Sequence, residues 1–301
     1  MTPYSHGSSS PRLPRWLHRP IAQPGQALAV EALLGELELN TVCQSAKCPN
    51  RSECFSAGTA TFMIMGDACT RGCRFCAVET RRPAPLDADE PRRIGEAASR
   101  MGLRHLVITT VTRDDLLDGG AAHFVATIAA VRSAVPGIAI EVLTSDFGGR
   151  LEGVDSVAAA RPDVYNHNLE TVPRLYADVR PGADYRRSLA VLARVHETQP
   201  SLPTKSGLML GLGETSDEVR DVMEDLLANG VSMLTLGQYL RPSVAHLPVA
   251  EFVEPSVFAQ LARDAYELGF AAVASAPFVR SSYRAGELAE DAAGHVALGE
   301  A

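Results

Sequence analysis

The chain has 301 residues, of which 46% are hydrophobic and 21% charged, and its 28 basic and 36 acidic side chains give a formal net charge of −8. This apolar content excludes disorder for the bulk of the chain, because it can fill a large core. The negative balance gives no overall electrostatic footprint for nucleic acid, and no apolar run is long enough to predict a membrane span.

Residues 1–27 are rich in Gly, Ser and Pro and are expected to form a flexible N-terminal arm. The arm has no apolar segment typical of a secretory signal, so a cytoplasmic protein is expected. A short helix is predicted over Ala27–Leu39. All six cysteines follow, between Cys43 and Cys76, in a stretch from Thr41 to Val78 whose Pro and Gly residues predict loop. Clustered thiols in a cytoplasmic chain indicate a metal or redox centre rather than disulfides.

From Thr61 onward, short apolar segments alternate with helical periods. The predicted strands are Thr61–Met65, His105–Thr110, Ile138–Leu143, Asp163–His167, Ser206–Leu210 and Ser232–Gly237. One helix between them begins at Thr215, where Glu218 completes a capping box. A later helix begins with Pro255 and ends at Gly269.

Strands that alternate with helices predict βαβ units and a parallel sheet. Six such units predict an α/β fold, a partial (β/α)6 barrel of the TIM type, with ligands at the C-terminal ends of the strands. A doubly wound open sheet fits the same periodicity.

The first cysteine triplet follows the first predicted strand. Cys69, Cys73 and Cys76 have the spacing Cys-x3-Cys-x2-Cys. Three thiolates can hold three irons of a four-iron four-sulfur (4Fe-4S) cluster and leave the fourth iron open to a ligand. The alternatives are a structural zinc site, with a fourth ligand such as His105, or free buried thiols.

This spacing, with Phe75 directly before the last cysteine, resembles the radical S-adenosylmethionine (SAM) superfamily. The resemblance implies a radical SAM partial barrel in which SAM chelates the open iron. It also implies that an electron from the cluster breaks the sulfonium bond and yields a 5′-deoxyadenosyl radical, chemistry that the cofactors carry.

The second triplet lies upstream. Cys43, Cys48 and Cys54 have the spacing Cys-x4-Cys-x5-Cys, which by itself leaves zinc and iron–sulfur equally open. The run from Thr41 to Cys54, together with the run from Ala60 to Asp67, resembles the lipoyl synthase family. Further matches are Thr112–Gly120, Asn166–Thr171, Val179–Pro181, Gly207–Glu214, Gly237–Pro242 and Arg280–Glu287, so that the resemblance extends from about Trp16 to Glu287.

The lipoyl synthase resemblance implies that the upstream triplet binds an auxiliary 4Fe-4S cluster. Its last iron would be held by a serine of the Arg-Ser-Ser-Tyr motif, which maps to Ser282, with Ser281 as the alternative. An alkoxide is a harder and less usual ligand for iron than a thiolate, and a weakly matched ligand can be released. The family is thought to break up this cluster to supply sulfur.

Several polar residues lie where a barrel places ligand groups. Those expected to contact the cofactor are Phe75, Thr110, Asn168, Glu170, Arg180, Gly211 and Glu214. Gly211 and Glu214 lie in a Gly-rich turn between a strand and a helix, a pattern that by itself favours a plain tight turn over a ligand site. The radical SAM resemblance implies that this turn lies near the adenine. His123 is expected to be structural, and His167 could be a core partner or a site residue. Arg113, Asp114, Asp115 and Asp118 are expected to form a loop ion network.

The resemblance implies radical insertion of two sulfurs, at carbon 6 and carbon 8, into an octanoyl chain bound to a lysine, with two SAM per product. The implied partners are octanoylated carrier domains, namely the glycine cleavage H protein and the acyltransferase subunits of 2-oxo acid dehydrogenases, and a low-potential electron donor. The alternatives are another sulfur-inserting radical SAM enzyme, such as a biotin synthase or methylthiotransferase relative, and a non-catalytic iron–sulfur electron carrier.

The expected organisation has four parts. These are the flexible arm (1–27), an auxiliary-cluster extension (28–60), the radical SAM barrel (61–275) and a C-terminal tail with the Arg-Ser-Ser-Tyr motif (276–301).

Overall fold

The computed structural model describes residues 13–18, 25–56 and 60–299, and its centre is a seven-stranded parallel sheet in the order β1-β4-β5-β6-β7-β8-β9. The strands are β1 (Thr61–Ile64), β4 (His105–Thr110), β5 (Ala139–Leu143), β6 (Val164–Asn166), β7 (Thr204–Leu210), β8 (Met233–Gln238) and β9 (Ala272–Ser275). The spatial order follows the chain without a reversal, which excludes the doubly wound alternative. Within the described residues β1 and β9 are the two edges, so the barrel is partial.

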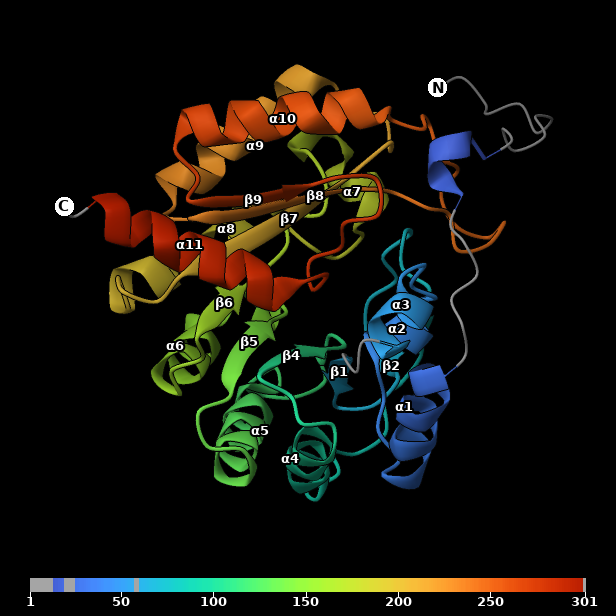
Figure 1. The fold of residues 1–301 in the computed structure, drawn as a ribbon, viewed down its shortest axis with the longest axis vertical. Helices are drawn as coiled ribbons and strands as arrows, with labels where there is room; N and C mark the ends of the chain where they lie inside the picture. Colours follow the sequence, from blue (N-terminus) through green and yellow to red (C-terminus); the bar gives the residue numbers. More distant parts are fainter. Residues whose placement is uncertain (1–12, 19–24, 57–59, 300–301) are drawn as a thin grey trace.

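Helices cover the outside of the sheet (Figure 1). The helices of the described residues are α1 (Gly25–Glu36), α2 (Val42–Ser45), α3 (Arg51–Ser56), α4 (Glu90–Arg100), α5 (Ala121–Ala134), α6 (Leu151–Ala159), α7 (Tyr176–Val179), α8 (Tyr185–Thr198), α9 (Ser216–Ala228), α10 (Pro255–Leu268) and α11 (Ala285–Gly299). Short 3-10 turns occupy η1 (Arg15–Leu17), η2 (Phe147–Gly149) and η3 (Pro173–Leu175), and a small second sheet pairs β2 (Ala68–Cys69) with β3 (Glu79–Thr80). No helix in the described ranges is long and apolar enough to cross a membrane.

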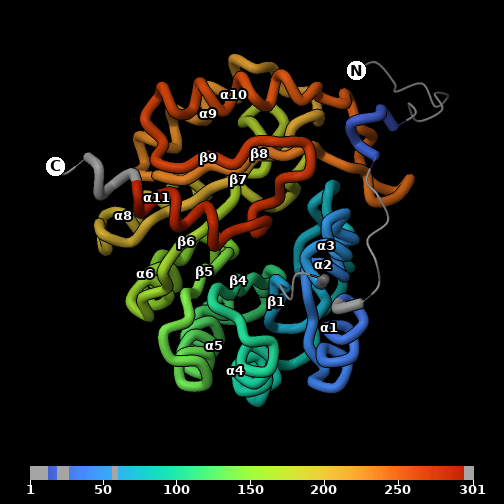
Figure 2. The backbone as a smooth tube through the Cα atoms, viewed as in Figure 1, coloured from blue at the N-terminus to red at the C-terminus, as the bar shows by residue number. Residues whose placement is uncertain are grey.

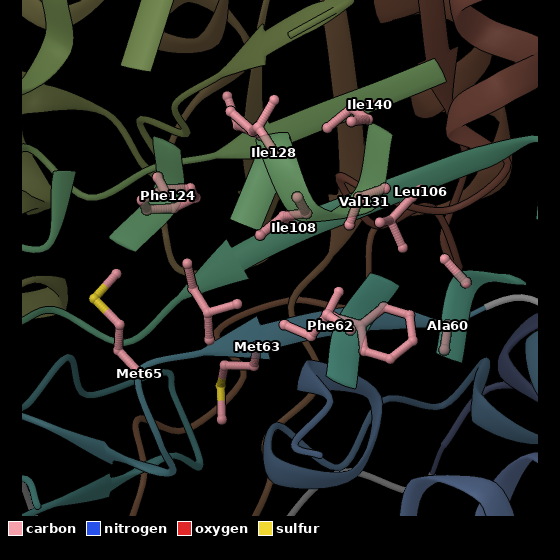
Figure 3. Packing of buried hydrophobic residues seen from close by; sticks show 14 of the residues in the cluster. Ala60, Phe62, Met63, Met65, Leu106, Ile108, Phe124, Ile128, Val131 and Ile140 are labelled. Carbon is pink, nitrogen blue, oxygen red and sulfur yellow. The ribbon is translucent and has the colours of Figure 1, made fainter. Parts of the chain in front are cut away.

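The pleat of the strands separates the helix-facing core from the barrel interior. On β4, Leu106 and Ile108 are fully buried and belong to the core cluster that includes Phe124 of α5 (Figure 3). The alternate residues Val107 and Thr109 border the internal cavity instead. Side chains on a strand alternate between its faces, so one strand supplies both the hydrophobic core and the cavity wall.

The C-terminal segment closes part of the barrel. Helices α1 to α3 lie beside the β1 edge, and the segment that follows β9 returns across the opening toward them (Figures 1 and 2). Leu288 and Ala292 of α11 then pack against Val164, Met233 and Ala272, each near the start of its strand. Helix α11 therefore covers the end of the barrel opposite the strand C-termini.

The predicted α/β partial barrel is confirmed, and all six predicted strands are present with small differences at their ends. The capping box at Thr215 and Glu218 and the left-handed Gly269 after α10 are also confirmed. The prediction missed β9, which has four residues of modest hydrophobicity. The loop prediction for 41–78 was wrong in part, because α2 and α3 form there, and the Thr41 hydroxyl caps α2 by accepting a hydrogen bond from the Gln44 amide.

The expected flexible arm falls largely on residues 1–12 and 19–24, which lie outside the described residues. The described part contains η1, where Leu17 is buried. The division of the chain into arm, extension, barrel and tail stays a prediction.

Candidate active site

A cavity of about 1880 Å³ runs between the C-terminal ends of the strands, the Cys-rich segments and the tail. Cys43, Cys48 and Cys54 of the upstream triplet border it, and so does Cys76 of the downstream triplet. Ser282 of the tail also lines it. The fold therefore brings two sets of thiols, separate in sequence, to one space.

The downstream cysteine loop is tied to the end of β4. The Cys69 sulfur accepts hydrogen bonds from the Thr112 amide at 3.3 Å and from the Arg71 amide at 3.4 Å. The Cys76 amide donates to the Cys73 carbonyl at 3.0 Å, which closes a tight turn between these two cysteines. A parallel barrel gathers its ligands at this end, so the loop occupies the place expected of a catalytic loop.

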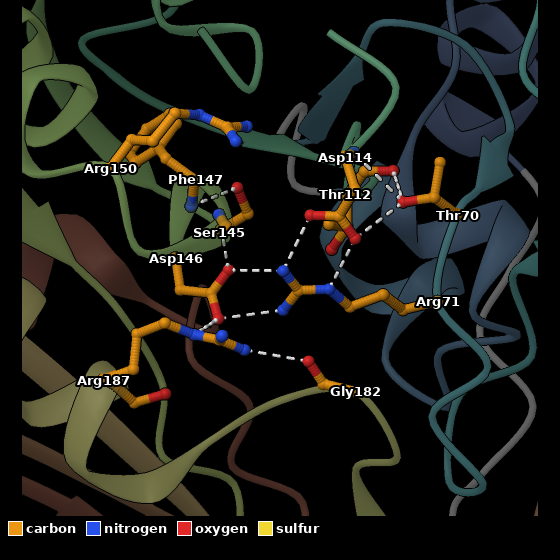
Figure 4. Close-up of polar contacts among 12 residues, drawn as sticks. Thr70, Arg71, Thr112, Asp114, Ser145, Asp146, Phe147, Arg150, Gly182 and Arg187 are labelled. Atoms are coloured by element: carbon orange, nitrogen blue, oxygen red, sulfur yellow. Dashed lines mark hydrogen bonds and ion pairs between the residues drawn. The ribbon is translucent and has the colours of Figure 1, made fainter. Parts of the chain in front are cut away.

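Arg71, between the first two cysteines of this loop, is held by two carboxylates (Figure 4). Its guanidinium donates to both oxygens of Asp114 at 2.7 Å and to both oxygens of Asp146 at 2.7 and 2.9 Å. Arg187 donates to the far side of Asp146 at 2.6 Å. Asp114 follows β4 and Asp146 follows β5, so this bidentate clamp fastens the cysteine loop to two neighbouring strand ends. Of the residues expected to form a loop ion network, Asp114 belongs to the Arg71 clamp. Arg113 pairs with Asp115 at 2.9 Å.

Burial opposes proton loss from two thiols of the downstream loop, Cys73 and Cys76. Burial raises the pKa of Cys76 to about 12, although a hydrogen bond from the Val78 backbone opposes it and the nearby Cys73 and Cys69 thiols add to it. Burial also raises the pKa of Cys73, against the charge of Arg180. Iron binds the thiolate, so loading this loop must release protons.

A loop after β8 covers the same cysteines from the other side. The His246 ring donates through Nε2 to the Cys76 carbonyl at 3.0 Å, and its Nδ1 accepts from the Ser243 hydroxyl at 2.8 Å. The Leu247 amide donates to the Arg74 carbonyl at 3.1 Å. The cysteine loop is therefore fastened on both sides.

Polar side chains that follow β6 face the cavity near Cys73. Glu170, whose φ of 68° is unusual for a residue other than glycine, accepts from the Asn168 amide at 3.1 Å. Burial raises the pKa of Glu170, and the charge of Arg180 opposes this shift. Arg180 donates to the Asn168 and Leu169 carbonyls at 3.0 and 3.1 Å and to the Tyr176 hydroxyl at 2.6 Å. These contacts place an acidic, an amide and a cationic group side by side.

Three polar atoms of this group have no hydrogen-bond partner within the described residues: Asn168 Oδ1, Arg180 Nε and His167 Nε2. His167 donates from Nδ1 to the Thr144 carbonyl at 2.9 Å, which leaves Nε2 as an acceptor. Burial lowers the pKa of His167 to about 4, so its ring is neutral. Buried polar atoms are normally paired, so three unpaired ones at one cavity fit a polar ligand such as SAM. A glycine at position 207 leaves room here, because a Cβ would lie 3.0 Å from Asn168 Oδ1.

Other expected cofactor contacts divide into two groups. Phe75 and Thr110 line the cavity with Asn168, Glu170 and Arg180. Gly211 and Glu214 are not brought into it: the Glu214 carboxylate accepts from the amides of Gly211, at 2.5 Å, and Leu212, at 3.0 Å. A Cβ at Gly211 would lie 2.2 Å from Gln238 Nε2, so this glycine makes room for the chain's own side chain. His123 is structural as expected, with its Nε2 2.7 Å from buried Glu90.

The upstream triplet gathers around Cys43, which is buried on α2. Burial raises the pKa of Cys43 to about 12, the Thr61 backbone hydrogen bond opposes the shift, and the Cys48 and Cys54 thiols add to it. The three thiols are therefore close enough to interact electrostatically. Thr61, the first residue of β1, also donates its hydroxyl hydrogen to Ser282 Oγ at 2.8 Å. This contact brings the expected serine ligand to the triplet.

Two further hydrogen bonds hold the tail against the Cys-rich helices. Asn50 Nδ2 donates to the Phe278 carbonyl at 2.7 Å, and the Tyr283 hydroxyl donates to Glu53 Oε1 at 2.7 Å. The buried Asn50 Oδ1 has no partner within the described ranges. The tail is thus docked by Asn50 and Glu53, side chains that lie beside cysteines of the upstream triplet.

The zinc alternatives find no preformed ligand set. Among the residues that the structure describes, no three His, Cys, Asp or Glu side chains are close enough to hold a single metal ion. His105 begins β4, whereas Cys69 lies beside Thr112 just past its end, so about 16 Å of strand separates them. The assignment of a four-iron cluster to each triplet stays a prediction.

Sequence reasoning did not assign Arg71, Thr61 or His246 to the site. Arg71 and Thr61 lie within or beside the cysteine motifs and could have been suspected from that position. His246 gave no signal, because only the course of the loop after β8 brings it to Cys76.

Known proteins share sequence and fold with this chain. Residues 63–226 match the family model described as the radical SAM superfamily. The chain is 57% identical to the lipoyl synthase of Methylococcus capsulatus over 92% of this chain and 87% of that protein. It is also 57% identical to the lipoyl synthase of Caldanaerobacter subterraneus subsp. tengcongensis, over 91% of this chain and 96% of that protein.

Solved structures share the fold at low sequence identity. The chain is similar to HydG, a maturase of the FeFe-hydrogenase, with a TM-score of 0.54 and 16% identity over 83% of this chain and 62% of that one. It is similar to methylornithine synthase (PylB), with a TM-score of 0.52 and 14% identity over 68% of this chain and 61% of that one.

Proposed function

The chain belongs to the lipoyl synthase family of the radical SAM superfamily, and from this premise we propose that it inserts two sulfur atoms, at carbon 6 and carbon 8, into an octanoyl group amide-linked to a lysine of a carrier domain. The family makes it an enzyme of the sulfurtransferase class that uses a 4Fe-4S cluster and SAM. The observation that carries the finer proposal is the single cavity bordered by both cysteine groups.

When bound, the first cluster and two SAM molecules supply the radicals that remove hydrogen, and the auxiliary cluster supplies the sulfur. Cys69, Cys73 and Cys76 hold the first cluster in this proposal. The Arg71 clamp keeps their loop in place, which fixes the cluster relative to the cavity. Residues that are packed and hydrogen-bonded in this way position a reactive group without reorganisation at each turnover.

In this proposal the polar group after β6 would hold SAM. Asn168 Oδ1, His167 Nε2 and Arg180 Nε are the unpaired atoms that support this assignment. In the proposal Arg180 binds the methionyl carboxylate, because guanidinium groups suit carboxylates. Glu170 accepts from hydroxyl or amine groups, and Phe75 and Thr110 complete the wall. Gly211 and Glu214 remain proposed contacts on the adenine side, although neither residue lines the cavity.

Cys43, Cys48, Cys54 and Ser282 hold the auxiliary cluster. Support comes from the mutual electrostatic influence of the three thiols and from the hydrogen bond that joins Ser282 to Thr61 beside Cys43. A serine oxygen is a poorer match for iron than a thiolate, which suits a site that must give up its cluster. Because Cys76 and the upstream triplet border one cavity, both clusters would act on a substrate held in that cavity.

The proposed partners follow from the substrate. Octanoylated carriers, namely the glycine cleavage H protein and the acyltransferase subunits of 2-oxo acid dehydrogenases, present the lysyl arm, and a low-potential donor supplies electrons. A cytoplasmic setting is proposed because reduced, clustered thiols persist there.

Separate counts of cleaved SAM and inserted sulfur test the proposal. Cys43/Cys48/Cys54→Ala should still release deoxyadenosine when incubated anaerobically with octanoylated carrier, SAM and reductant, since its radical site is intact. Mass spectrometry of the carrier should show no added sulfur. Normal lipoyl formation by this variant would overturn the sulfur-donor assignment.

A further inference from the structure

Thr61 lies between two of the proposed ligands of the auxiliary cluster. Its hydroxyl donates to Ser282 Oγ at 2.8 Å across 221 residues of sequence. Its backbone also hydrogen-bonds the Cys43 thiol, and its hydroxyl oxygen lies near the same thiol. Thr61 itself is 5% exposed and lines the cavity.

We propose that Thr61 is a positioning residue that holds the Ser282 oxygen in the orientation that binds iron, an inference that rests on the proposed function. Ser282 lies between β9 and α11, outside any regular strand or helix, and a serine side chain has three staggered rotamers. Thr61 is fixed, because β1 pairs with β4 at Val107 and its next residue, Phe62, is fully buried. A hydrogen bond from this fixed point selects one rotamer of the serine.

The direction of the hydrogen bond suits iron binding. Thr61 donates and Ser282 accepts, so the bond does not use the proton that serine must lose to become a ligand. A hydrogen bond to an anionic acceptor is stronger than one to a neutral acceptor, so the contact strengthens when the serine becomes an alkoxide. The same donor therefore serves the empty and the loaded site, and the tail stays aligned for refilling after sulfur has been donated.

The neighbouring strand provides a matched control. Thr109 of β4 is also 5% exposed and borders the same cavity, but its hydroxyl donates to the Leu143 carbonyl at 3.1 Å. Thr109→Val removes a buried hydroxyl from the same wall without touching the serine. Thr61→Val is nearly isosteric and keeps the β-branched strand residue, so it removes the donor with little change in packing.

The test measures how readily the auxiliary cluster loses the iron held by serine. Each substitution is made in the full chain carrying Cys69/Cys73/Cys76→Ala, so that only the auxiliary cluster contributes. After anaerobic reconstitution and mild oxidation, electron paramagnetic resonance quantifies the three-iron form. Thr61→Val and Thr61→Ala should raise its fraction about three- to tenfold, as expected for the loss of one hydrogen bond. Thr61→Ser should restore the parent value, and Thr109→Val should leave it unchanged.

Ser282→Ala distinguishes the role of Thr61 from the proposed function of Ser282 as an iron ligand. If Ser282→Ala raises the three-iron fraction while both Thr61 variants match the parent, the role of Thr61 is overturned and the serine ligand stands. If Ser282→Ala leaves the fraction unchanged, the serine assignment itself fails. A rise in Thr109→Val equal to that in Thr61→Val would also contradict the inference, because any lost hydroxyl would then have the same effect.

Discussion

The two cysteine segments are held in different ways, although they face one cavity. The downstream loop, 69–76, is fastened by ion pairs: Arg71 binds Asp114 and Asp146 with four hydrogen bonds of 2.7 to 2.9 Å. The upstream segment, 43–54, contacts the tail through the neutral hydrogen bond from Asn50 to the Phe278 carbonyl. Its Glu53 also accepts from the Tyr283 hydroxyl and forms one exposed ion pair, at 3.9 Å, with Arg284. Charge-assisted bidentate pairs are roughly twice as strong as neutral hydrogen bonds. The difference teaches that the loop proposed to keep its cluster is the firmly fixed one, and the segment proposed to surrender its cluster is the lightly held one.

The largest expected effect separates the two clusters outright. Cys69/Cys73/Cys76→Ala should lower iron from about eight to about four per chain, because six thiolates divide into two four-iron sites. SAM cleavage, measured as deoxyadenosine by chromatography, should fall to background. The matched Cys43/Cys48/Cys54→Ala variant should lose as much iron and keep SAM cleavage. Equal loss of cleavage in both variants would show that the two segments do not have separate roles.

Breaking the Arg71 clamp should cost stability and positioning together. Asp146→Asn removes the carboxylate, 2% exposed, that pairs with Arg71, whose side chain is 10% exposed. Loss of one partner of a buried pair costs about 3 kcal/mol, measured by urea unfolding at pH 7, and the rate of SAM cleavage should fall with it. As a control, Glu96→Gln disturbs the exposed pair with Arg92 and should cost no more than about 0.5 kcal/mol. Similar costs for the two variants would remove the physical basis of the comparison.

The same clamp should weaken in acid. Burial raises the pKa of the Asp146 carboxyl, but the hydrogen bonds and charge of Arg71 outweigh burial and hold this pKa well below its usual range. A group with a lowered folded pKa stabilises the fold above its unfolded pKa of about 3.9, and this contribution is lost as the pH falls. The gap in unfolding free energy between wild type and Asp146→Asn should therefore stay constant from pH 7 to about 5 and narrow below about 4. Urea titrations at each pH measure this difference in unfolding free energy. A difference that widens in acid would contradict the lowered pKa of Asp146.

The smallest effect is expected at the tail. Tyr283→Phe deletes the hydroxyl that donates to Glu53 at 2.7 Å and should lower the free energy of unfolding by about 1 kcal/mol. Hydrogen exchange should become faster over 278–284, while deoxyadenosine release stays at the wild-type rate. A loss as large as that of Asp146→Asn would mean that the tail is held as firmly as the cysteine loop.

Much of the fold follows from local patterns. Alternating apolar segments predicted six of the seven strands of the central sheet. The Thr215–Glu218 capping box predicted the start of α9. Strand β9 was not predicted because Ala272–Ser275 is short and weakly apolar. Its strand conformation depends on pairing with β8. Helices α2 and α3 escaped because each is six residues or shorter, and packing rather than propensity stabilises helices of that length.

By itself, the sequence determined the family, the two cysteine triplets and the periodicity of strands and helices, because each depends on residues near one another in the chain. Only the tertiary structure decided that the triplets share a cavity and that Thr61 meets Ser282. Only the tertiary structure showed that Arg71 pairs with Asp114 and Asp146, because these two residues follow neighbouring strands. Contacts between residues far apart in sequence depend on the order and direction of the strands that carry them, and no local pattern encodes these.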